Sequence, residues 1–349
     1  MSHLYAFIMA GGRGERFWPL SVYSRPKQFV SLFGGRPLIA HAADRLETVV
    51  PRENIYVITS QDLVPATQAA LPDIPKANII GEPMGRDTAA AVALACGITL
   101  KRDPNGVAAI LTADHLMADV SAFRRVLTDT YSVAASRPVI ATIGIAPTFP
   151  ATGYGYIECA DTLTTDADIG TPFRRVRRFV EKPDRATAEA YLATGAFVWN
   201  AGMFIWQAGI MREAFEKYAP AWLPVIKYPD AIRTLYPTLP KLSVDYAIME
   251  KSDSLVVARG DFGWDDVGSL PAIAEHFPTD ADGNTAISPA ITLNSTSCII
   301  AAEGDQRTTA LLGVSDLIVV HTSKATLVCA KSAAQDIKKL VAKLPPDLK

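Results

Sequence analysis

The chain has 349 residues, with 34 basic against 36 acidic side chains and a formal net charge of -2. At roughly 150 residues per domain this length predicts one large domain with an appendage, or two domains; 49% hydrophobic and 20% charged residues are ordinary for a globular protein. Without a basic excess we expect no nucleic-acid partner, although a local basic cluster can still hold a phosphorylated small molecule.

Short apolar runs alternate with helix-like segments in the first half of the chain. Buried strands are predicted at residues 4–9, 55–59, 108–111 and 139–143, and helices at residues 37–49, 63–71, 88–101 and 120–136. This alternation favours right-handed βαβ units, and therefore an α/β fold with a Rossmann-like, mainly parallel mixed sheet flanked by helices. Ligands bind such sheets at the carboxyl ends of the strands, so we expect the site in loops that follow strands.

The second half changes character twice. A mixed region of strands and helices runs from about residue 153 to Pro278, and a turn-rich break follows at residues 280–284. Three short β-like runs follow, at residues 298–302, 317–320 and 325–329. An amphipathic helix is then predicted at residues 333–344. We therefore predict two domains, residues 1–280 and residues 284–349, the second being a small β-rich appendage closed by a helix.

The cysteines and the apolar stretches exclude several classes of protein. Cys96, Cys159, Cys298 and Cys329 form no CxxC pair, which argues against a zinc ribbon, a redox dithiol and a disulfide framework. The longest strongly apolar stretch, residues 89–100, is shorter than the about 20 residues that a membrane helix needs. No charged region precedes the N-terminal apolar run, so we expect no signal peptide, no membrane partner and a cytoplasmic location.

The first predicted strand runs directly into a glycine turn at residues 11–14. Glycines in this position let backbone N–H groups approach an anion. A dinucleotide fingerprint would need glycine where Phe17 stands, and no Walker A sequence occurs. Four cations follow the strand end closely: Arg13, Arg16, Arg25 and Lys27. These residues can be interpreted as a phosphate-binding site. The glycines taken by themselves are explained equally well by a surface turn with solvated charges.

Further motifs in the sequence favour the phosphate-binding interpretation of this turn. Gly-Gly-x-Gly-x-Arg-x-x-Pro-Leu followed by Pro-Lys resembles the signature of the sugar-1-phosphate nucleotidyltransferases, and Phe-Val-Glu-Lys-Pro resembles a second signature of that family. Seven motifs stand in the family's order: residues 11–27, 82–88, 112–115, 153–158, 179–183, 199–203 and 264–268. Together they resemble the mannose-1-phosphate guanylyltransferase branch, in its form without a phosphomannose isomerase domain.

The match has departures and leaves alternatives open. Asp87 stands where the family usually has asparagine, and the alanine run after it lacks the family's common proline. The alternatives are thymidylyl, uridylyl or adenylyl transfer to glucose 1-phosphate, and a non-catalytic sensor of sugar nucleotides. A sensor is expected to lose Arg16, Lys182 or a metal-binding aspartate, and this sequence keeps them.

The resemblance implies GTP and mannose 1-phosphate as substrates, with a phosphate oxygen of the sugar attacking the α-phosphorus while pyrophosphate leaves. This nucleophile is already an anion, so the chemistry needs cations and backbone N–H groups rather than a general base. By resemblance, Gly11, Gly12 and Gly14 wrap the triphosphate. Arg16 neutralises the departing pyrophosphate, while Arg13 and Lys27 lie over the β/γ- and α-phosphates.

Two aspartates are implied as ligands of Mg²⁺, which typically takes one or two carboxylates besides phosphate oxygens and water. Asp114 follows the strand at residues 108–111, and Asp265 and Asp266 are adjacent far downstream. The resemblance selects Asp114 with Asp266, and implies the catalytic set Arg16, Lys27, Asp114 and Asp266. A helix N-cap is the alternative role of Asp114, and we expect one of the two adjacent aspartates to be structural.

The remaining motifs are implied to bind the sugar and the base. Lys182 would hold the sugar phosphate and Glu181 the mannose hydroxyls, with Asn200 and the backbone of Gly155 as further partners. A further loop lies between a short predicted strand and a helix that Thr88 is able to cap. The resemblance implies that this loop binds guanine through Glu82, Pro83, Gly85, Arg86, Asp87 and Thr88. The basic run at residues 174–178 is interpreted as an exposed strand face from which one arginine can reach a phosphate.

The closing helix carries an apolar stripe of Ile337, Leu340, Val341 and Leu344. Such a stripe packs either on its own domain or on another subunit. Symmetric dimers are the commonest soluble assembly. We therefore expect a homodimer contact in the tail, and the chemistry to stay within residues 4–280.

Overall fold

The computed structural model describes residues 3–12, 14–166, 168–304 and 307–349. The chain forms two compact units, each assembled from separate segments. The first comprises residues 1–11, 42–113 and 117–264, and the second residues 12–41, 114–116 and 265–349. The chain passes between them after Gly11 and after Ala113, and within α1 (Leu38–Asp44), β5 (Leu116–Met117) and β11 (Trp264–Asp265). The division at residues 280–284 expected from the sequence stays a prediction.

The first unit is built on a nine-stranded sheet with the order β3-β2-β1-β4-β9-β6-β10-β8-β7. Its strands are β1 (Leu4–Ala10), β2 (Ile55–Ser60), β3 (Ile79–Glu82), β4 (Val107–Thr112), β6 (Ile140–Ile145), β7 (Tyr156–Leu163), β8 (Phe173–Val180), β9 (Phe197–Gln207) and β10 (Leu255–Gly260). β1, β2, β3 and β4 pair in parallel, and this half contains three of the four strands predicted first from the sequence. Their nearly continuous apolar sequences are typical of strands covered on both faces.

The other half of the sheet is mixed. β9 is antiparallel to both β4 and β6, and β7 and β8 form an antiparallel pair. The fold is therefore the expected α/β arrangement of a mixed sheet flanked by helices. The strands that pair in parallel are β1 through β4 in one half of the sheet and β6 with β10 in the other.

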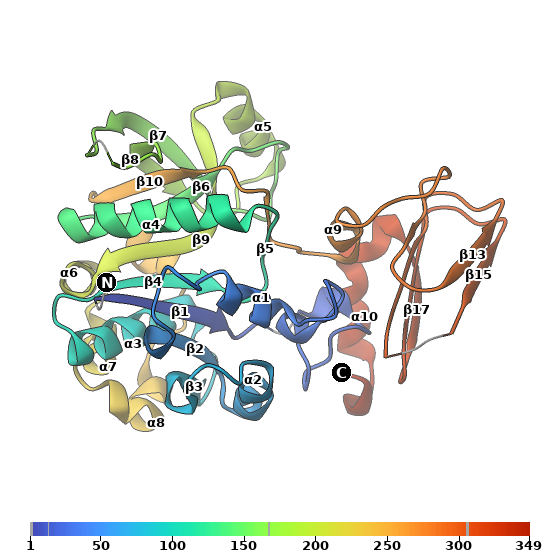
Figure 1. The fold of residues 1–349 in the computed structure, drawn as a ribbon, viewed down its shortest axis with the longest axis horizontal. Helices are drawn as coiled ribbons and strands as arrows, with labels where there is room; N and C mark the ends of the chain where they lie inside the picture. Colours follow the sequence, from blue (N-terminus) through green and yellow to red (C-terminus); the bar gives the residue numbers. More distant parts are fainter. Residues whose placement is uncertain (1–2, 13, 167, 305–306) are drawn as a thin grey trace. The chain divides into compact units, whose positions relative to one another are not determined.

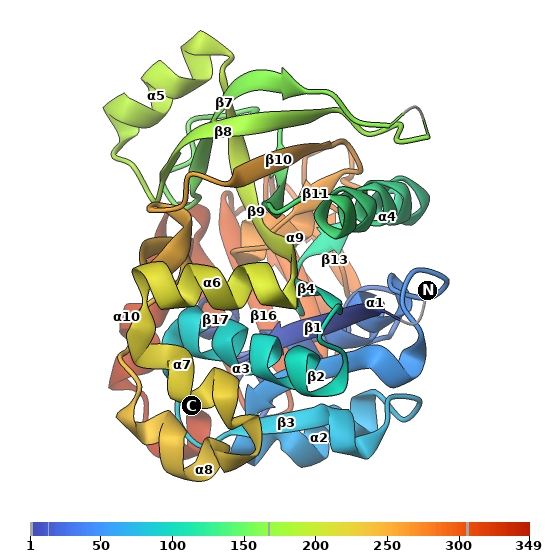
Figure 2. The ribbon, with the colours of Figure 1, turned by 90° about the vertical axis from the view of Figure 1, so that its left-hand side faces the viewer.

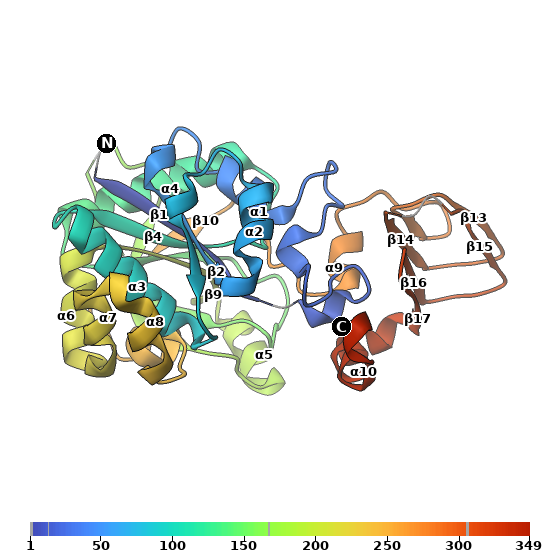
Figure 3. The same ribbon diagram turned by 90° about the horizontal axis from the view of Figure 1, so that it is seen from below.

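Helices cover both faces of this sheet. They are α2 (Val64–Ala70), α3 (Asp87–Arg102), α4 (Val120–Ser136), α5 (Arg185–Thr194), α6 (Ala208–Tyr218), α7 (Leu223–Lys227) and α8 (Ile232–Leu235). Figures 2 and 3 show α3, α6, α7 and α8 on one face and α4 on the other. α3 is rich in alanine and is packed closely: the backbone oxygen of Ile226 lies 2.6 Å from where a Cβ on Gly97 would stand. α4 begins at the expected residue because the Asp119 carboxylate accepts a hydrogen bond from the N–H of Ala122 at 2.8 Å.

The second unit joins the glycine turn to the C-terminal tail. Its helical elements are the 3₁₀ helices η1 (Glu15–Phe17), η2 (Lys27–Phe29) and η10 (Lys331–Asp336), with α9 (Leu270–Ala274) and α10 (Ile337–Lys343). Its strands are β12 (Thr285–Ala286), β13 (Ala290–Leu293), β14 (Ile299–Glu303), β15 (Thr309–Leu312), β16 (Leu317–Thr322) and β17 (Thr326–Ala330). The chain coils so that β12, β14 and β16 form parallel pairs and β13 pairs in parallel with β15 (Figures 1 and 3). The β-rich tail closed by a helix is thus confirmed.

The apolar core of the second unit contains residues from both ends of the chain. Phe17 and Trp18 of the N-terminal segment share one buried cluster with Ile318, Ile337 and Val341 of the tail. Ile337 and Val341 therefore pack on their own chain, whereas Leu340 of the same predicted stripe is 41% exposed. The stripe is thus divided between the core and the surface.

In the described part of the chain no helix is long and apolar enough to cross a membrane. All four cysteines are free, and Cys96, Cys159 and Cys298 are buried.

Candidate functional site

The glycine turn is shaped by Gly14, which lies at the start of η1. Its φ of 63° is in the left-handed region that favours glycine, and its carbonyl oxygen accepts hydrogen bonds from the N–H of Phe17 and the hydroxyl of Ser21. A Cβ on Gly14 would lie 2.9 Å from the backbone nitrogen of Lys27. Glycine is required here both for the turn and for the close approach of Lys27. Arg13, expected to bind phosphate, lies outside the described residues.

Lys27 is the buried cation of this turn, with only 5% of the residue exposed. Its ammonium donates a hydrogen bond to the Asp114 carboxylate at 2.9 Å and another to the backbone oxygen of Asp266 at 2.6 Å. A buried ammonium is stable only when such partners replace water. Lys27 therefore connects the glycine turn to the two segments that carry the predicted metal-binding aspartates.

Asp114 keeps its negative charge in this environment. Burial by itself would raise the pKa of its carboxyl, but the neighbouring Lys27 ammonium and His115 hold that pKa below its ordinary value. Asp114 does not cap a helix, since Asp119 caps α4. The N-cap alternative is therefore wrong, and an ionised carboxylate stands beside the glycine turn.

Asp265 and Asp266 have different environments. The Asp265 carboxylate accepts a hydrogen bond from the N–H of Val267 at 2.7 Å and lies 2.7 Å from a ring nitrogen of His276. Asp266 instead lines the pocket, beside Gly268, where a Cβ would come within 3.1 Å of its carboxylate. Val267 between them has a φ of 48°, a strained conformation for a β-branched residue. The strained turn thus separates a structural aspartate from one in the pocket.

These groups surround a pocket of about 490 Å³ that lies entirely within the second unit. It is lined by Gly14, Glu15, Arg16, Phe17, Lys27, Asp114, His115, Asp266, Gly268 and Lys338. All four residues of the expected catalytic set are therefore in one pocket. Lys338 of α10 also lines this pocket, so the tail reaches it. That the chemistry stays within residues 4–280 remains a prediction.

The donor atoms on this pocket fit a hard divalent cation. No cluster of three or more metal-binding side chains occurs among the described residues, but Mg²⁺ needs only one or two carboxylates when phosphate oxygens and water complete its shell. Asp114 and Asp266 supply two carboxylates on the wall of one pocket, and Asp114 is ionised. The absence of a side chain at Gly268 leaves space beside the Asp266 carboxylate.

The loop expected to bind the base lies in the first unit, between β3 and α3. Glu82 accepts a hydrogen bond from the Tyr236 hydroxyl, and burial raises the pKa of the Glu82 carboxyl. A Cβ on Gly11 would be 3.4 Å from that carboxylate, which places the end of β1 beside this loop. Arg86 donates to the carbonyl oxygen of Pro237. Three members of the expected set, Pro83, Gly85 and Asp87, are exposed.

Thr88 does not cap α3, contrary to the expectation. The helix begins one residue earlier, at Asp87, and the Thr88 hydroxyl accepts a hydrogen bond from the N–H of Val244 at 2.8 Å. Asp87 has a φ of 56°, a conformation that aspartate and asparagine adopt more readily than most residues. Thr88 therefore connects the loop to the segment of Val244 by a hydrogen bond and does not cap the helix.

The residues expected to bind the sugar phosphate lie together in the first unit. The carbonyl oxygen of Gly155 accepts a hydrogen bond from the N–H of Asn200 at 2.8 Å, and a Cβ on Gly155 would overlap the Glu181 carboxylate. The Lys182 ammonium donates to that carboxylate at 2.7 Å. Burial acts to lower the pKa of Lys182, but the negative charge of Glu181 outweighs it and the pKa is raised. Lys182 therefore keeps its positive charge.

Asp245 is a member of this group that the sequence analysis missed. It begins the π-helix η9 (Asp245–Met249) and accepts a hydrogen bond from the Asn200 amide at 3.3 Å. Burial and the nearby charge of Glu181 raise the pKa of Asp245 to about 6. In the sequence, Asp245 is simply an aspartate shortly before the apolar residues Ala247–Met249. This pattern is too common to indicate a site.

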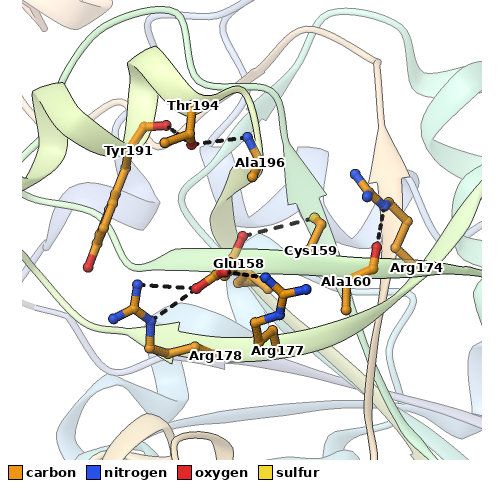
Figure 4. A network of polar contacts seen from close by, with 10 residues as sticks. Glu158, Cys159, Ala160, Arg174, Arg177, Arg178, Tyr191, Thr194 and Ala196 are labelled. Atoms are coloured by element: carbon orange, nitrogen blue, oxygen red, sulfur yellow. Dashed lines mark hydrogen bonds and ion pairs between the residues drawn. The ribbon is translucent and has the colours of Figure 1, made fainter.

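The basic run on β8 is mostly engaged by protein groups. Glu158 of β7 accepts a hydrogen bond from Arg177 at 3.0 Å and another from Arg178 at 3.2 Å, and Arg174 donates to the carbonyl oxygen of Ala160 (Figure 4). Arg174, Arg175, Arg177 and Arg178 are exposed. The exposed strand face is confirmed, and three of its guanidinium groups stabilise the hairpin of β7 and β8.

The site can be compared with known proteins. The family model described as "Nucleotidyl transferase" matches residues 5–283 of this chain. The chain belongs to the nucleotidyl transferase family. A second model, described as "MannoseP isomerase/GMP-like beta-helix domain", matches residues 288–344, which form most of the coiled tail. The resemblance found in the sequence motifs is thereby confirmed.

Similar proteins extend this result. The chain is 36% identical to the mannose-1-phosphate guanylyltransferase of Escherichia coli K12, over 99% of this chain and 74% of that protein. It is 34% identical to the xanthan biosynthesis protein XanB of Xanthomonas campestris, over 99% of this chain and 74% of that protein. A crystal structure from Thermus thermophilus, described as a mannose-1-phosphate geranyltransferase, has a TM-score of 0.86 and 33% identity, and covers 98% of this chain and 99% of its own.

Proposed function

We propose that this protein transfers GMP from GTP to α-D-mannose 1-phosphate, giving GDP-mannose and pyrophosphate. Family membership and relatives named mannose-1-phosphate guanylyltransferase support the reaction class and the substrates. The observation that carries the proposal is the pocket that joins Arg16, Lys27, Asp114 and Asp266. A non-catalytic sensor has no need to keep this set together.

The chemistry follows from the charges of the reactants. A phosphate oxygen of mannose 1-phosphate forms a bond to the α-phosphorus of GTP, and the bond from that phosphorus to the bridging oxygen of pyrophosphate breaks. Because the nucleophile is already an anion, no side chain has to remove a proton. The barrier comes from bringing two polyanions together and from charge developing on the leaving group.

In the mechanism we propose, the residues share this task. Arg16 offsets charge on the departing pyrophosphate, the backbone of the glycine turn binds the triphosphate, and Lys27 lies near the α-phosphate. Lys182 binds the sugar phosphate. The Glu181 carboxylate accepts hydrogen bonds from mannose hydroxyls, and the Asn200 amide is a further hydrogen-bond partner of the sugar. We propose that Asp114 and Asp266 hold Mg²⁺, which when bound supplies positive charge toward the phosphate oxygens.

A pyrophosphate-release assay tests the proposal. Wild-type protein is offered each of the four nucleoside triphosphates with mannose 1-phosphate or glucose 1-phosphate, with Mg²⁺ or with EDTA. We expect release only with Mg²⁺, and fastest with GTP and mannose 1-phosphate. Preference for another nucleotide or for glucose 1-phosphate would assign a different transfer, and no release with any pair would reject catalysis.

We also propose that the protein is a cytoplasmic homodimer. Four free thiols support a reducing compartment. An exposed apolar surface in the tail supports self-association: Ile291 and Leu293 on β13 and Leu312 on β15, with Leu293 paired to Leu312. Monomers rarely expose adjoining apolar side chains of this size, and identical surfaces meet across a two-fold axis.

A further inference from the structure

The C-terminal helix supports the glycine turn directly. Ile337 and Val341 of α10 are 3% and 2% exposed and share a core cluster with Phe17 and Trp18. The indole N–H of Trp18 donates a hydrogen bond to the carbonyl oxygen of Leu348 at 2.8 Å. The 3₁₀ helix that carries Arg16 is therefore packed against the last residues of the chain.

Lys338 is brought to the pocket by this packing. It follows Ile337, and its side chain lines the same pocket as Arg16, Lys27, Asp114 and Asp266. Within the described parts of the chain, the Lys338 ammonium has no hydrogen-bond or ion-pair partner. The next lysine differs: Lys339 pairs with Asp336 at 2.7 Å and does not line the pocket.

The cations of the pocket fall into two kinds. Lys27 is buried and already bound to Asp114, whereas Arg16 and Lys338 are exposed and, among described residues, neither side chain has a charged partner. An exposed lysine is a flexible point charge that adapts to phosphate oxygens. Charge-assisted hydrogen bonds to phosphate are stronger than neutral ones, and each added cation offsets more of the charge of a polyphosphate.

We propose that Lys338 binds the terminal phosphates of the nucleoside triphosphate, the part released as pyrophosphate, beside Arg16. The inference rests on the proposed function for the identity of the ligand, and it gives the β-rich tail a direct part in substrate binding. Lys338 contacts these phosphates in the bound substrate and in the product alike. Its removal should therefore weaken binding more than it slows the chemical step.

The test compares Lys338→Ala and Lys338→Arg with the matched control Lys339→Ala. Binding of inorganic pyrophosphate, measured by calorimetry in the presence of Mg²⁺, is the readout that does not depend on turnover. We expect Lys338→Ala to raise the Kd for pyrophosphate and the KM for GTP about tenfold. The KM for mannose 1-phosphate should stay constant, Lys338→Arg should recover most of the affinity, and Lys339→Ala should behave as wild type.

Two results would overturn the inference: wild-type pyrophosphate affinity in Lys338→Ala, or an equal loss in Lys339→Ala. Equal melting temperatures of the variants exclude unfolding as the cause. Failure of the proposed function is distinguishable from these results. If wild-type protein binds pyrophosphate but transfers no nucleotide, the reaction is rejected, while the comparison of Lys338→Ala with Lys339→Ala still decides the role of Lys338.

Discussion

A side chain on Gly14 would meet the backbone of Lys27, since a Cβ built on Gly14 lies 2.9 Å from the Lys27 nitrogen. We therefore expect Gly14→Ala to displace Lys27 and lower kcat/KM by about 100-fold or more, because small displacements of catalytic groups have effects of this size. Pyrophosphate release measures the effect. Gly209→Ala, in α6 with open space around its Cβ, is the control. Full activity of Gly14→Ala would show that the contact is dispensable.

The two adjacent aspartates should give different phenotypes. Asp114→Asn and Asp266→Asn are expected to lower kcat by at least about 100-fold, because both carboxylates are proposed to hold Mg²⁺. Asp265→Asn should mainly lower the free energy of unfolding, by about 1 to 3 kcal/mol, because its carboxylate bonds Val267 and His276.

Activity assays with added Mg²⁺ and thermal denaturation of the same three variants separate these effects. An inactive but stable Asp265→Asn, together with an active Asp266→Asn, would reverse the assignment. Full wild-type activity in EDTA would reject the metal.

Lys182 and Arg16 should affect different kinetic constants. Lys182→Ala is expected to raise the KM for mannose 1-phosphate about tenfold, since its charge acts on the phosphate before and during the reaction. Arg16→Ala should lower kcat by about 100-fold, because charge develops on its partner only as pyrophosphate leaves. Steady-state kinetics in both substrates test the division. The roles are misassigned if Lys182→Ala leaves the KM for mannose 1-phosphate unchanged and Arg16→Ala alters only the KM for GTP.

Asp245 should make stability depend on pH. Its pKa is raised to about 6, so between about pH 4 and pH 6 the folded state binds more protons than the unfolded state. The free energy of unfolding therefore falls as the pH rises through this range. Asp245→Asn has no such charge and keeps an oxygen to accept the Asn200 hydrogen bond.

We expect Asp245→Asn to be more stable than wild type above pH 6, by on the order of 1 to 2 kcal/mol, and the difference to disappear below pH 4. Denaturation at pH 4, 6 and 8 measures it. A constant difference across these values would mean that Asp245 is not the titrating group.

Local patterns in the sequence predicted much of the fold. The apolar runs of β1, β2 and β4 and the amphipathic α4 are visible without knowledge of distant contacts. The position of β9 between β4 and β6 was not predictable, since strand order depends on pairing between segments far apart in the chain. Thr88 was misjudged for a related reason: its partner, Val244, belongs to another segment.

Short motifs in the sequence singled out residues that the structure brings together. Gly14 and Lys27 come from the first motif and Asp266 from the last, and all three line the pocket. Lys338 was missed because a lysine beside buried Ile337 has the usual pattern of an amphipathic surface helix. Only the packing of α10 on the 3₁₀ helix of Arg16 reveals that this lysine lines the pocket.

The surface proposed to form the dimer contains leucines that mutation can test. The apolar stripe of the closing helix was the predicted dimer contact, but Ile337 and Val341 of this stripe are buried within their own chain. Leu293 and Leu312 pair on β13 and β15 and are 61% and 70% exposed. Light scattering should give the wild type twice the 37.5 kDa mass of one chain.

The double variant Leu293→Asp/Leu312→Asp should scatter as a monomer, because charges on two facing surfaces both repel and resist burial. Leu340→Asp, on the exposed side of α10, should stay dimeric. A monomeric Leu340→Asp with a dimeric double variant would move the contact to the helix, and a monomeric wild type would reject the dimer. Since neither leucine lines the pocket, retained pyrophosphate binding by the double variant would show that dimer formation and phosphate binding are separate functions of the tail.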